Sequence, residues 1–136
     1  AYMRLLCVED NSTLRATVDL MLAPAGIDVD FATDGAEAVE AWQFNEYDAV
    51  LMDIEMPGMN GLAAVRAIRR MEDGFHLGYT PVLFLSSYDD EAHVERADEA
   101  GGDGFLAKPF TTETLLGALD GLMRQRRGGD LSLAAQ

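Results

Sequence analysis

Acidic, hydroxyl and ammonium side chains directly follow or end four short apolar runs of the sequence. They are, in chain order, Glu9 and Asp10, Asp53, Ser86 and Ser87, and Lys108. Clustered carboxylates repel one another unless a cation lies among them. Because the candidate ligands are all oxygen atoms, they select a hard ion, with Mg²⁺ as the usual choice and Mn²⁺ as the alternative. The residue types therefore predict a metal site that holds a phosphoryl group beside Asp53.

In such a site Asp53 can act as a nucleophile and form an acyl phosphate. Mg²⁺ held by Glu9 and Asp10 would neutralise the transferring oxygens, while the Lys108 ammonium and the Ser86 hydroxyl would each take another phosphoryl oxygen. Positioning and charge compensation are most of what phosphoryl transfer requires of a protein.

Each of these features also has a purely structural explanation. The acidic pair could complement the dipole of the helix that follows it, and Ser86-Ser87 could serve an ordinary turn. Lys108 could pair with any of the 24 acidic residues. Their joint occurrence at four predicted strand ends, in order, favours the functional interpretation.

The helices and strands that would position these residues are predicted from the pattern of the sequence. Short apolar runs alternate with longer amphipathic ones, which is typical of a parallel sheet covered by helices. Strands are predicted at 4–8, 27–32, 49–52, 82–85 and 105–107. Helices are predicted from Asn11 or Ser12 to 22, from Asp34, at 62–71, at 90–100, and from Thr111 or Thr112, with 72–80 as a loop. Five such units make a doubly wound α/β fold, in which ligands bind beyond the carboxyl ends of the strands.

Length and charge limit the domain organisation and the partners. The 136 residues suffice for one domain, predicted at 1–126, and the basic, then Gly-rich end predicts a flexible tail or linker at 127–136. A formal net charge of −14 argues against direct contact with nucleic acid. No stretch reaches the roughly 20 apolar residues that span a bilayer. We therefore expect a cytoplasmic domain without membrane contact.

Four segments in order resemble the receiver domain of two-component response regulators. They are LLCVEDN (5–11), DAVLMDIEMPGMNGL (48–62), TPVLFLSS (80–87) and GFLAKPF (104–110), and the resemblance covers Met3 to Arg126. It implies a flavodoxin-like fold with five helices and a sheet of strand order 2-1-3-4-5. The sequence of these segments is most like that of receivers in hybrid sensor histidine kinases. It further implies that the domain is a phosphoacceptor module rather than an enzyme. The only reactions expected of it are self-phosphorylation and slow autodephosphorylation, unless it is part of a longer hybrid kinase.

The resemblance also assigns the site. It implies that Asp53 is the phosphoacceptor and that Glu9, Asp10, Asp53 and the backbone carbonyl of Glu55 bind the metal. The acidic pair is Glu-Asp where many relatives have Asp-Asp, and the longer Glu9 side chain can hold the metal through water.

The other assigned roles concern the response to phosphorylation. Ser86 would be the switch hydroxyl, Lys108 the phosphoryl-binding lysine and Phe105 the aromatic residue that changes rotamer. Pro109 would follow a cis peptide bond. Glu55 and Tyr88 occupy positions that tune phosphoryl lifetime in relatives.

The implied partner is a histidine kinase or a histidine phosphotransfer protein that donates from its own phosphohistidine. The fourth and fifth helical segments, with the strand between them, would form the face that responds to phosphorylation and the surface through which a homodimer could form.

Two alternative functions stay open. One is a phosphorylation-independent pseudo-receiver that acts as a protein-interaction module, which the complete acidic and basic set disfavours. The other is a haloacid-dehalogenase-type phosphatase, which places its nucleophile on the first strand with a second aspartate two residues on. Here the nucleophile would lie on the third strand, followed by Glu55.

Overall fold

A computed structural model describes the backbone of residues 3–134 and the side chains up to residue 125. The strands are β1 (Arg4–Val8), β2 (Asp28–Ala32), β3 (Ala49–Asp53), β4 (Val82–Ser86) and β5 (Gly104–Ala107). The helices are α1 (Ser12–Leu22), the short 3₁₀ helix η1 (Ala23–Ala25), α2 (Gly35–Phe44), α3 (Gly61–Gly74), α4 (Glu91–Glu99) and α5 (Thr112–Ala134).

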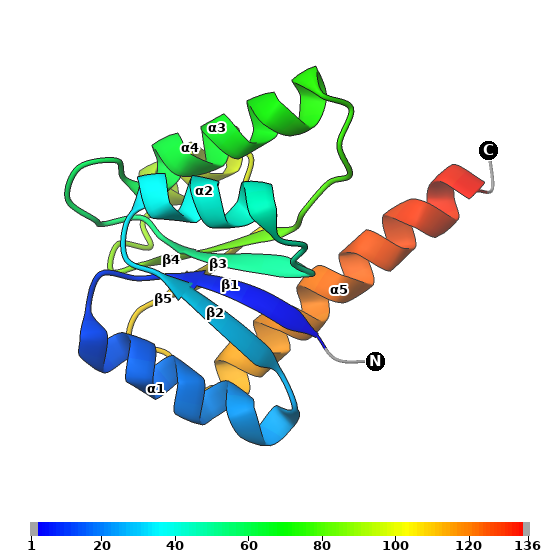
Figure 1. Ribbon diagram of the computed structural model, residues 1–136. Helices are drawn as coiled ribbons and strands as arrows, with labels where there is room; N and C mark the ends of the chain where they lie inside the picture. The colour runs from blue at the N-terminus through cyan, green and yellow to red at the C-terminus, as the bar shows by residue number, and fades with distance from the viewer. Residues whose placement is uncertain (1–2, 135–136) are drawn as a thin grey trace.

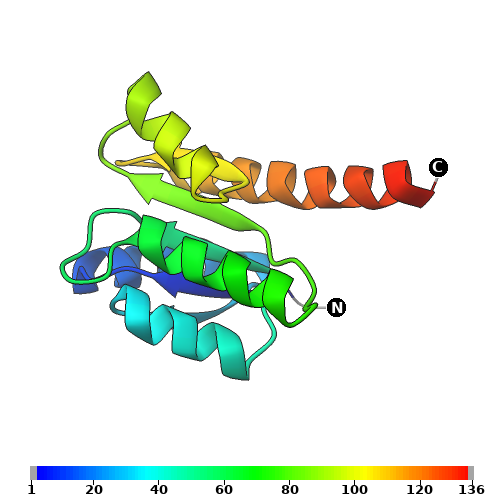
Figure 2. The same cartoon turned by 90° about the horizontal axis from the view of Figure 1, so that it is seen from above.

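The five strands form one parallel sheet in the order β2-β1-β3-β4-β5. Helices α1 and α5 cover one face, and α2, α3 and α4 cover the other (Figures 1 and 2). The predicted doubly wound, flavodoxin-like fold is therefore confirmed. In this strand order β1 and β3 are neighbours, and the chain reverses its direction of winding there, which is where such folds place their ligands.

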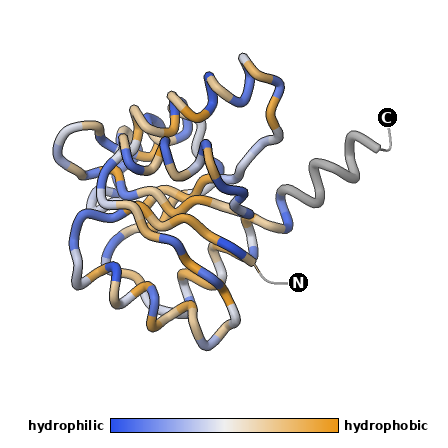
Figure 3. Tube along the Cα trace, in the orientation of Figure 1, coloured by the Kyte–Doolittle hydropathy of each residue, from blue (hydrophilic) through white to orange (hydrophobic). Residues whose placement is uncertain are grey.

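The central strands are apolar except at their ends, because helices cover both of their faces. Successive side chains alternate between two cores, as the pleat of a strand requires. On β1, Leu6 and Val8 join the core under α2, α3 and α4. Leu5 and Cys7 join the core under α1 and α5. In Figure 3 the sheet is mostly hydrophobic, whereas the helices on both sides of it alternate between hydrophobic and hydrophilic residues.

Side-chain caps fix where α1, α2 and α3 begin. The side chains of Asn11, Asp34 and Asn60 accept hydrogen bonds from backbone amides in the first turns of α1, α2 and α3. The caps at Asn11 and Asp34 agree with the sequence prediction. Glu37 does not complete a capping box with Asp34, since its carboxylate accepts the hydroxyl of Thr33 instead.

Helix α3 is longer than predicted. It runs to Gly74, so the prediction of a loop from Glu72 was wrong for its first three residues. Glu72 is buried and accepts hydrogen bonds from Arg69 and from the backbone amide of Thr80. Those partners offset the cost of burying its carboxylate and hold the last turn of the helix in place.

Helix α5 continues to Ala134 and so includes most of the segment predicted as a tail. The domain boundary at Arg126 stays a prediction. Within residues 3–134, none of the helices has the length and apolar character needed to cross a bilayer.

Candidate functional site

The carboxyl ends of β1, β3 and β5 bring Glu9, Asp53 and Lys108 into direct contact. Val8 and Met52 are register partners on β1 and β3, so the residues that follow them are neighbours. The Lys108 ammonium donates to Glu9 Oε1 at 2.9 Å and to Asp53 Oδ1 at 2.8 Å. Both carboxylates are about 1% exposed. Three residues far apart in the sequence therefore form one buried charge cluster.

When all three groups are ionised, this cluster carries one negative charge in excess, because two buried carboxylates share one ammonium. Burial raises the pKa of Asp53 to about 7; the hydrogen bond from Lys108 opposes this shift, and the charge of Glu9 adds to it. Burial would lower the pKa of Lys108, but its hydrogen bonds to Asp53 and Glu9 outweigh burial and raise that pKa. The cluster is thus poised to accept a further cation.

A divalent cation fits the atoms that surround Asp53. Among the residues with described side chains, Asp53 Oδ2 is a buried oxygen without a hydrogen-bond partner. Carboxylate oxygens of Glu9, Asp10 and Asp53 lie within 4.8 Å of one another, and Asp10 is exposed to solvent. A set made only of carboxylate oxygens suits Mg²⁺. The structure therefore brings together the three predicted acidic ligands.

We expect the replacement Asp53→Asn to stabilise the metal-free protein. Because the pKa of Asp53 is raised in the folded state to about 7, the folded protein binds more protons than the unfolded chain between about pH 4 and pH 7. Its stability therefore falls as the pH rises through that range. The neutral amide removes this loss, so the gain should be at most about 4 kcal/mol above pH 7 and should shrink toward pH 4. Urea unfolding at several pH values measures it, and a gain independent of pH would contradict the explanation.

The loop between β3 and α3 requires glycine at position 61. A Cβ atom there would lie 2.2 Å from the backbone oxygen of Asp53. The amide of Gly61 donates to the carbonyl of Ile54 at 3.2 Å, which folds the loop back onto the strand end. Gly58 has a φ of 74°, which favours glycine at that turn as well. These glycines let the loop close tightly over the carboxylate site.

Replacing Gly61 by alanine should therefore lower the free energy of unfolding by about 2 kcal/mol, the usual cost of forcing an extra carbon into packed surroundings. Gly117→Ala is the matched control, because a Cβ at Gly117 on α5 meets no atom within 4 Å. That change should stabilise the protein by about 0.5–1 kcal/mol through helix propensity. Equal losses in the two variants, measured by urea unfolding, would contradict the close approach.

Ser86 and Glu55 form a second contact beside the cluster. The Ser86 hydroxyl is fully buried and donates to Glu55 Oε2 at 2.7 Å. Glu55 Oε1 accepts the backbone amide of Ser87, also at 2.7 Å. The amide of Tyr88 in turn donates to Ser86 Oγ at 3.0 Å. Sequence reasoning missed this contact, since a carboxylate two residues after Asp53 gives no sign of which way it turns.

The other candidate residues are Tyr88, Phe105 and Pro109. Tyr88 is 55% exposed and its ring stacks on His93 of α4, with ring centroids 5.0 Å apart. Phe105 is half-buried against the core on the α4 side, next to a pocket of about 350 Å³ between α4 and β5. The Lys108–Pro109 peptide bond is cis, as the resemblance implies. Tyr88 is thus a neighbour of the site, and Phe105 belongs to the adjoining face.

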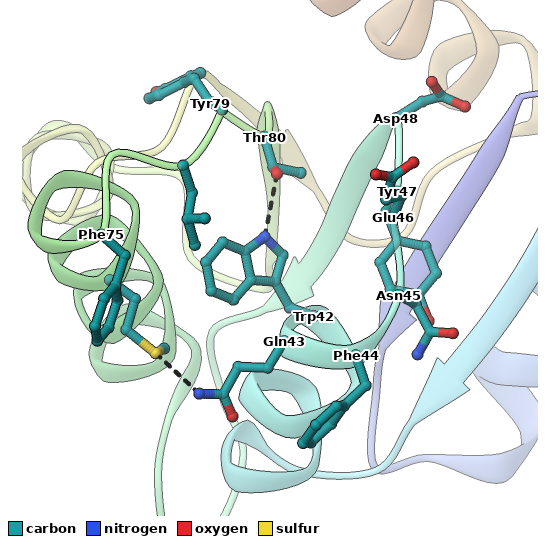
Figure 4. A pocket seen from close by; sticks show the side chains of 13 residues that line it. Trp42, Gln43, Phe44, Asn45, Glu46, Tyr47, Asp48, Phe75, Tyr79 and Thr80 are labelled. Carbon is teal, nitrogen blue, oxygen red and sulfur yellow. Dashed lines mark hydrogen bonds between the residues drawn. The ribbon is translucent and has the colours of Figure 1, made fainter.

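A larger pocket of about 810 Å³ lies at the opposite edge of the sheet. Figure 4 shows its wall, where Trp42 Nε1 donates to Thr80 Oγ1 at 3.1 Å. Asp48 and Thr80, which also line it, stand before the amino ends of β3 and β4, whereas Asp53 ends β3. Because Trp42 is the sole tryptophan, its fluorescence reports on this pocket and is no direct probe of the carboxylates.

Comparisons with known proteins agree on one family. A family model described as the response regulator receiver domain matches residues 5–120. The regulatory protein VanRB of Enterococcus faecalis is 37% identical over 123 residues, which are 90% of this chain and 53% of that protein. The transcriptional regulatory protein PrrA of Mycobacterium tuberculosis is 35% identical over 123 residues, 90% of this chain and 51% of that protein. The chain thus spans about half the length of these curated relatives.

Solved structures show the same likeness. The Vibrio cholerae chemotaxis protein CheY4 matches with a TM-score of 0.81 and 34% identity, covering 90% of this chain and 99% of that one. The receiver domain of the sensor histidine kinase PA1611 from Pseudomonas aeruginosa matches with a TM-score of 0.79 and 33% identity, covering 90% and 98%. That structure is described as having a magnesium ion coordinated in the active site cleft.

Proposed function

Because this chain belongs to the response regulator receiver domain family, we propose that its Asp53 accepts a phosphoryl group from a phosphohistidine. The donor would be a histidine kinase or a histidine phosphotransfer protein. The observation that carries this proposal is the buried Asp53 carboxylate, which has one oxygen on Lys108 and the other without a hydrogen-bond partner among the described side chains. A buried carboxylate left half unsatisfied favours a reactive role over a purely structural one.

In the proposed step an oxygen of Asp53 forms a bond to phosphorus as the P–N bond of the donor breaks. The electron pair of that bond stays on the donor imidazole, and the product is an acyl phosphate. Asp53 needs no base, because the carboxylate is already ionised above about pH 7. The Lys108 ammonium, 2.8 Å from Asp53 Oδ1, is placed to pair with a phosphoryl oxygen.

We further propose that Glu9, Asp10, Asp53 and the backbone carbonyl of Glu55 hold Mg²⁺, with Mn²⁺ as an alternative ion. When bound, the ion supplies positive charge that offsets both the carboxylates and the transferring phosphoryl oxygens. The excess negative charge of the cluster and the unpartnered oxygen of Asp53 support this assignment. The magnesium described in the related receiver of PA1611 points the same way.

The response to phosphorylation is proposed to pass through Ser86 and Phe105 to the face formed by α4, β5 and α5. That face would contact the downstream partner or a second copy of the chain. Glu55 and Tyr88 are proposed to tune the lifetime of the acyl phosphate. Membership of a longer hybrid histidine kinase and a cytoplasmic location stay predictions.

Incubation with acetyl phosphate and Mg²⁺, followed by intact-mass measurement, tests the proposed function. The protein should gain the mass of one phosphoryl group, and it should gain none with EDTA or as Asp53→Asn. Asp89→Asn, which changes an exposed acid on the loop after β4, is the control and should be phosphorylated like the unchanged protein. No mass gain in the unchanged protein would instead support the pseudo-receiver alternative.

A further inference from the structure

The Glu55 carboxylate uses both of its oxygens on donors at the end of β4. One oxygen accepts the Ser86 hydroxyl and the other accepts the Ser87 amide, each at 2.7 Å. These are short, charge-assisted hydrogen bonds, which are stronger than bonds between neutral groups. Glu55 therefore forms a two-point clamp on the last residue of β4 and on the residue that follows it.

The clamp occupies the Ser86 hydroxyl, the donor that is proposed to serve a phosphoryl group on Asp53. Asp53 and Leu85 are register partners on β3 and β4, so Ser86 lies one residue beyond the partner of the phosphoacceptor. A serine hydroxyl has a single hydrogen to donate. Since Ser86 is fully buried and its hydrogen is directed at Glu55, it cannot also serve a phosphoryl oxygen.

We propose that Glu55 acts as an internal stand-in for the phosphoryl group: its carboxylate holds the Ser86 hydroxyl and the Ser87 amide until phosphorylation displaces it. This inference rests on the proposed function of Asp53. If the hydroxyl turned toward a phosphoryl oxygen while Glu55 stayed, two oxygen atoms would face each other at 2.7 Å without a hydrogen between them. Glu55 must therefore leave, and the added negative charge on Asp53 favours its departure.

The clamp makes the unphosphorylated arrangement more stable and so opposes phosphorylation. Part of the free energy that the phosphoryl group gains from Ser86 is offset by the loss of the two bonds to Glu55. Glu55 is accordingly a positioning residue, which sets how strongly the domain responds through the placement of Ser86.

Three variants separate the clamp from simple charge repulsion. Glu55→Gln removes the charge and leaves one acceptor oxygen for two donors. Glu55→Asp keeps the charge but is shorter by one carbon, so it cannot reach both donors. Asp89→Asn removes an exposed charge from the neighbouring loop and is the control for a general change in charge. Each is titrated by calorimetry with fluoroberyllate and Mg²⁺, a mimic of the phosphorylated carboxylate.

The clamp predicts that Glu55→Asp and Glu55→Gln both bind fluoroberyllate about tenfold more tightly than the unchanged protein, the effect expected for losing one competing charged hydrogen bond. Asp89→Asn should change the affinity less than about twofold, as expected of a screened surface charge. If Glu55→Asp binds like the unchanged protein while Glu55→Gln binds more tightly, repulsion alone acts and the clamp is overturned.

The Ser87 amide gives a second readout that needs no ligand. In the unchanged protein its proton should resonate downfield, because the amide donates to a carboxylate at 2.7 Å. In Glu55→Asp it should move upfield, and an unmoved signal would also overturn the clamp. Failure of the proposed function looks different, since then even the unchanged protein would bind no fluoroberyllate.

Discussion

Replacing Lys108 by methionine is expected to lower the free energy of unfolding by about 3 kcal/mol near pH 8, the effect of removing one partner from a buried ion pair. The ammonium donates to Glu9 and to Asp53, and its side chain is only 18% exposed. Without it, two buried carboxylates face each other with no cation between them. The loss should be smaller near pH 5, where a proton can bind between the carboxylates.

Urea unfolding measures this loss, and Mg²⁺ should reduce it by supplying the missing positive charge. Arg124→Met is the control, because Arg124 is 73% exposed and pairs with Asp120 on the surface of α5. Its loss should stay within about 0.5 kcal/mol. If Lys108→Met were no more harmful than this control, the charge cluster would not be the compact arrangement described above.

The second large effect concerns Ser86. Ser86→Ala should still be phosphorylated at Asp53, since the hydroxyl does not touch that carboxylate among the described hydrogen bonds. It should lose most of the conformational response, because the buried side-chain donor that would follow the phosphoryl group is gone. The response is read as the change in backbone amide shifts around Phe105 when fluoroberyllate and Mg²⁺ are added.

Ser87→Ala is the matched control for that experiment. Ser87 is exposed, and only its backbone amide takes part in the contact with Glu55, so its hydroxyl is dispensable. It should keep the full response. A full response in Ser86→Ala, or an equal loss in both variants, would refute the route through the Ser86 hydroxyl.

Much of the fold could be predicted from local patterns. Apolar runs, cap residues such as Asn11, and glycine turns lie close together in the sequence, and they place each strand within one residue of its observed bounds. The predicted end of α3 was wrong because Glu72 is stabilised by distant groups. Arg69, one turn before it, also bonds to Asp103 and lies over the ring of Tyr79. No local pattern indicates such a network.

The candidate site shows the same limit. The strand ends predicted that Glu9, Asp53 and Lys108 would meet, because parallel strands carry their carboxyl ends to one edge. The sequence could not predict that Glu55 would turn toward Ser86, since a side-chain rotamer depends on the packed surroundings. The sequence shows Gly61 as a glycine that follows a proline and another glycine. It does not show that a Cβ at this position would meet the backbone of Asp53.

A crystal structure with Mg²⁺ and fluoroberyllate tests the central claim most directly. We predict one ion bound directly by Asp10, Asp53 and the backbone carbonyl of Glu55, and held by Glu9 through a metal-bound water molecule. Fluoroberyllate should be bound to Asp53 within hydrogen-bond distance of the Lys108 ammonium. The Ser86 hydroxyl should have left Glu55 for the fluoroberyllate. An ion bound elsewhere, or a Lys108 ammonium turned away from Asp53, would contradict a metal-assisted phosphoacceptor at this edge of the sheet.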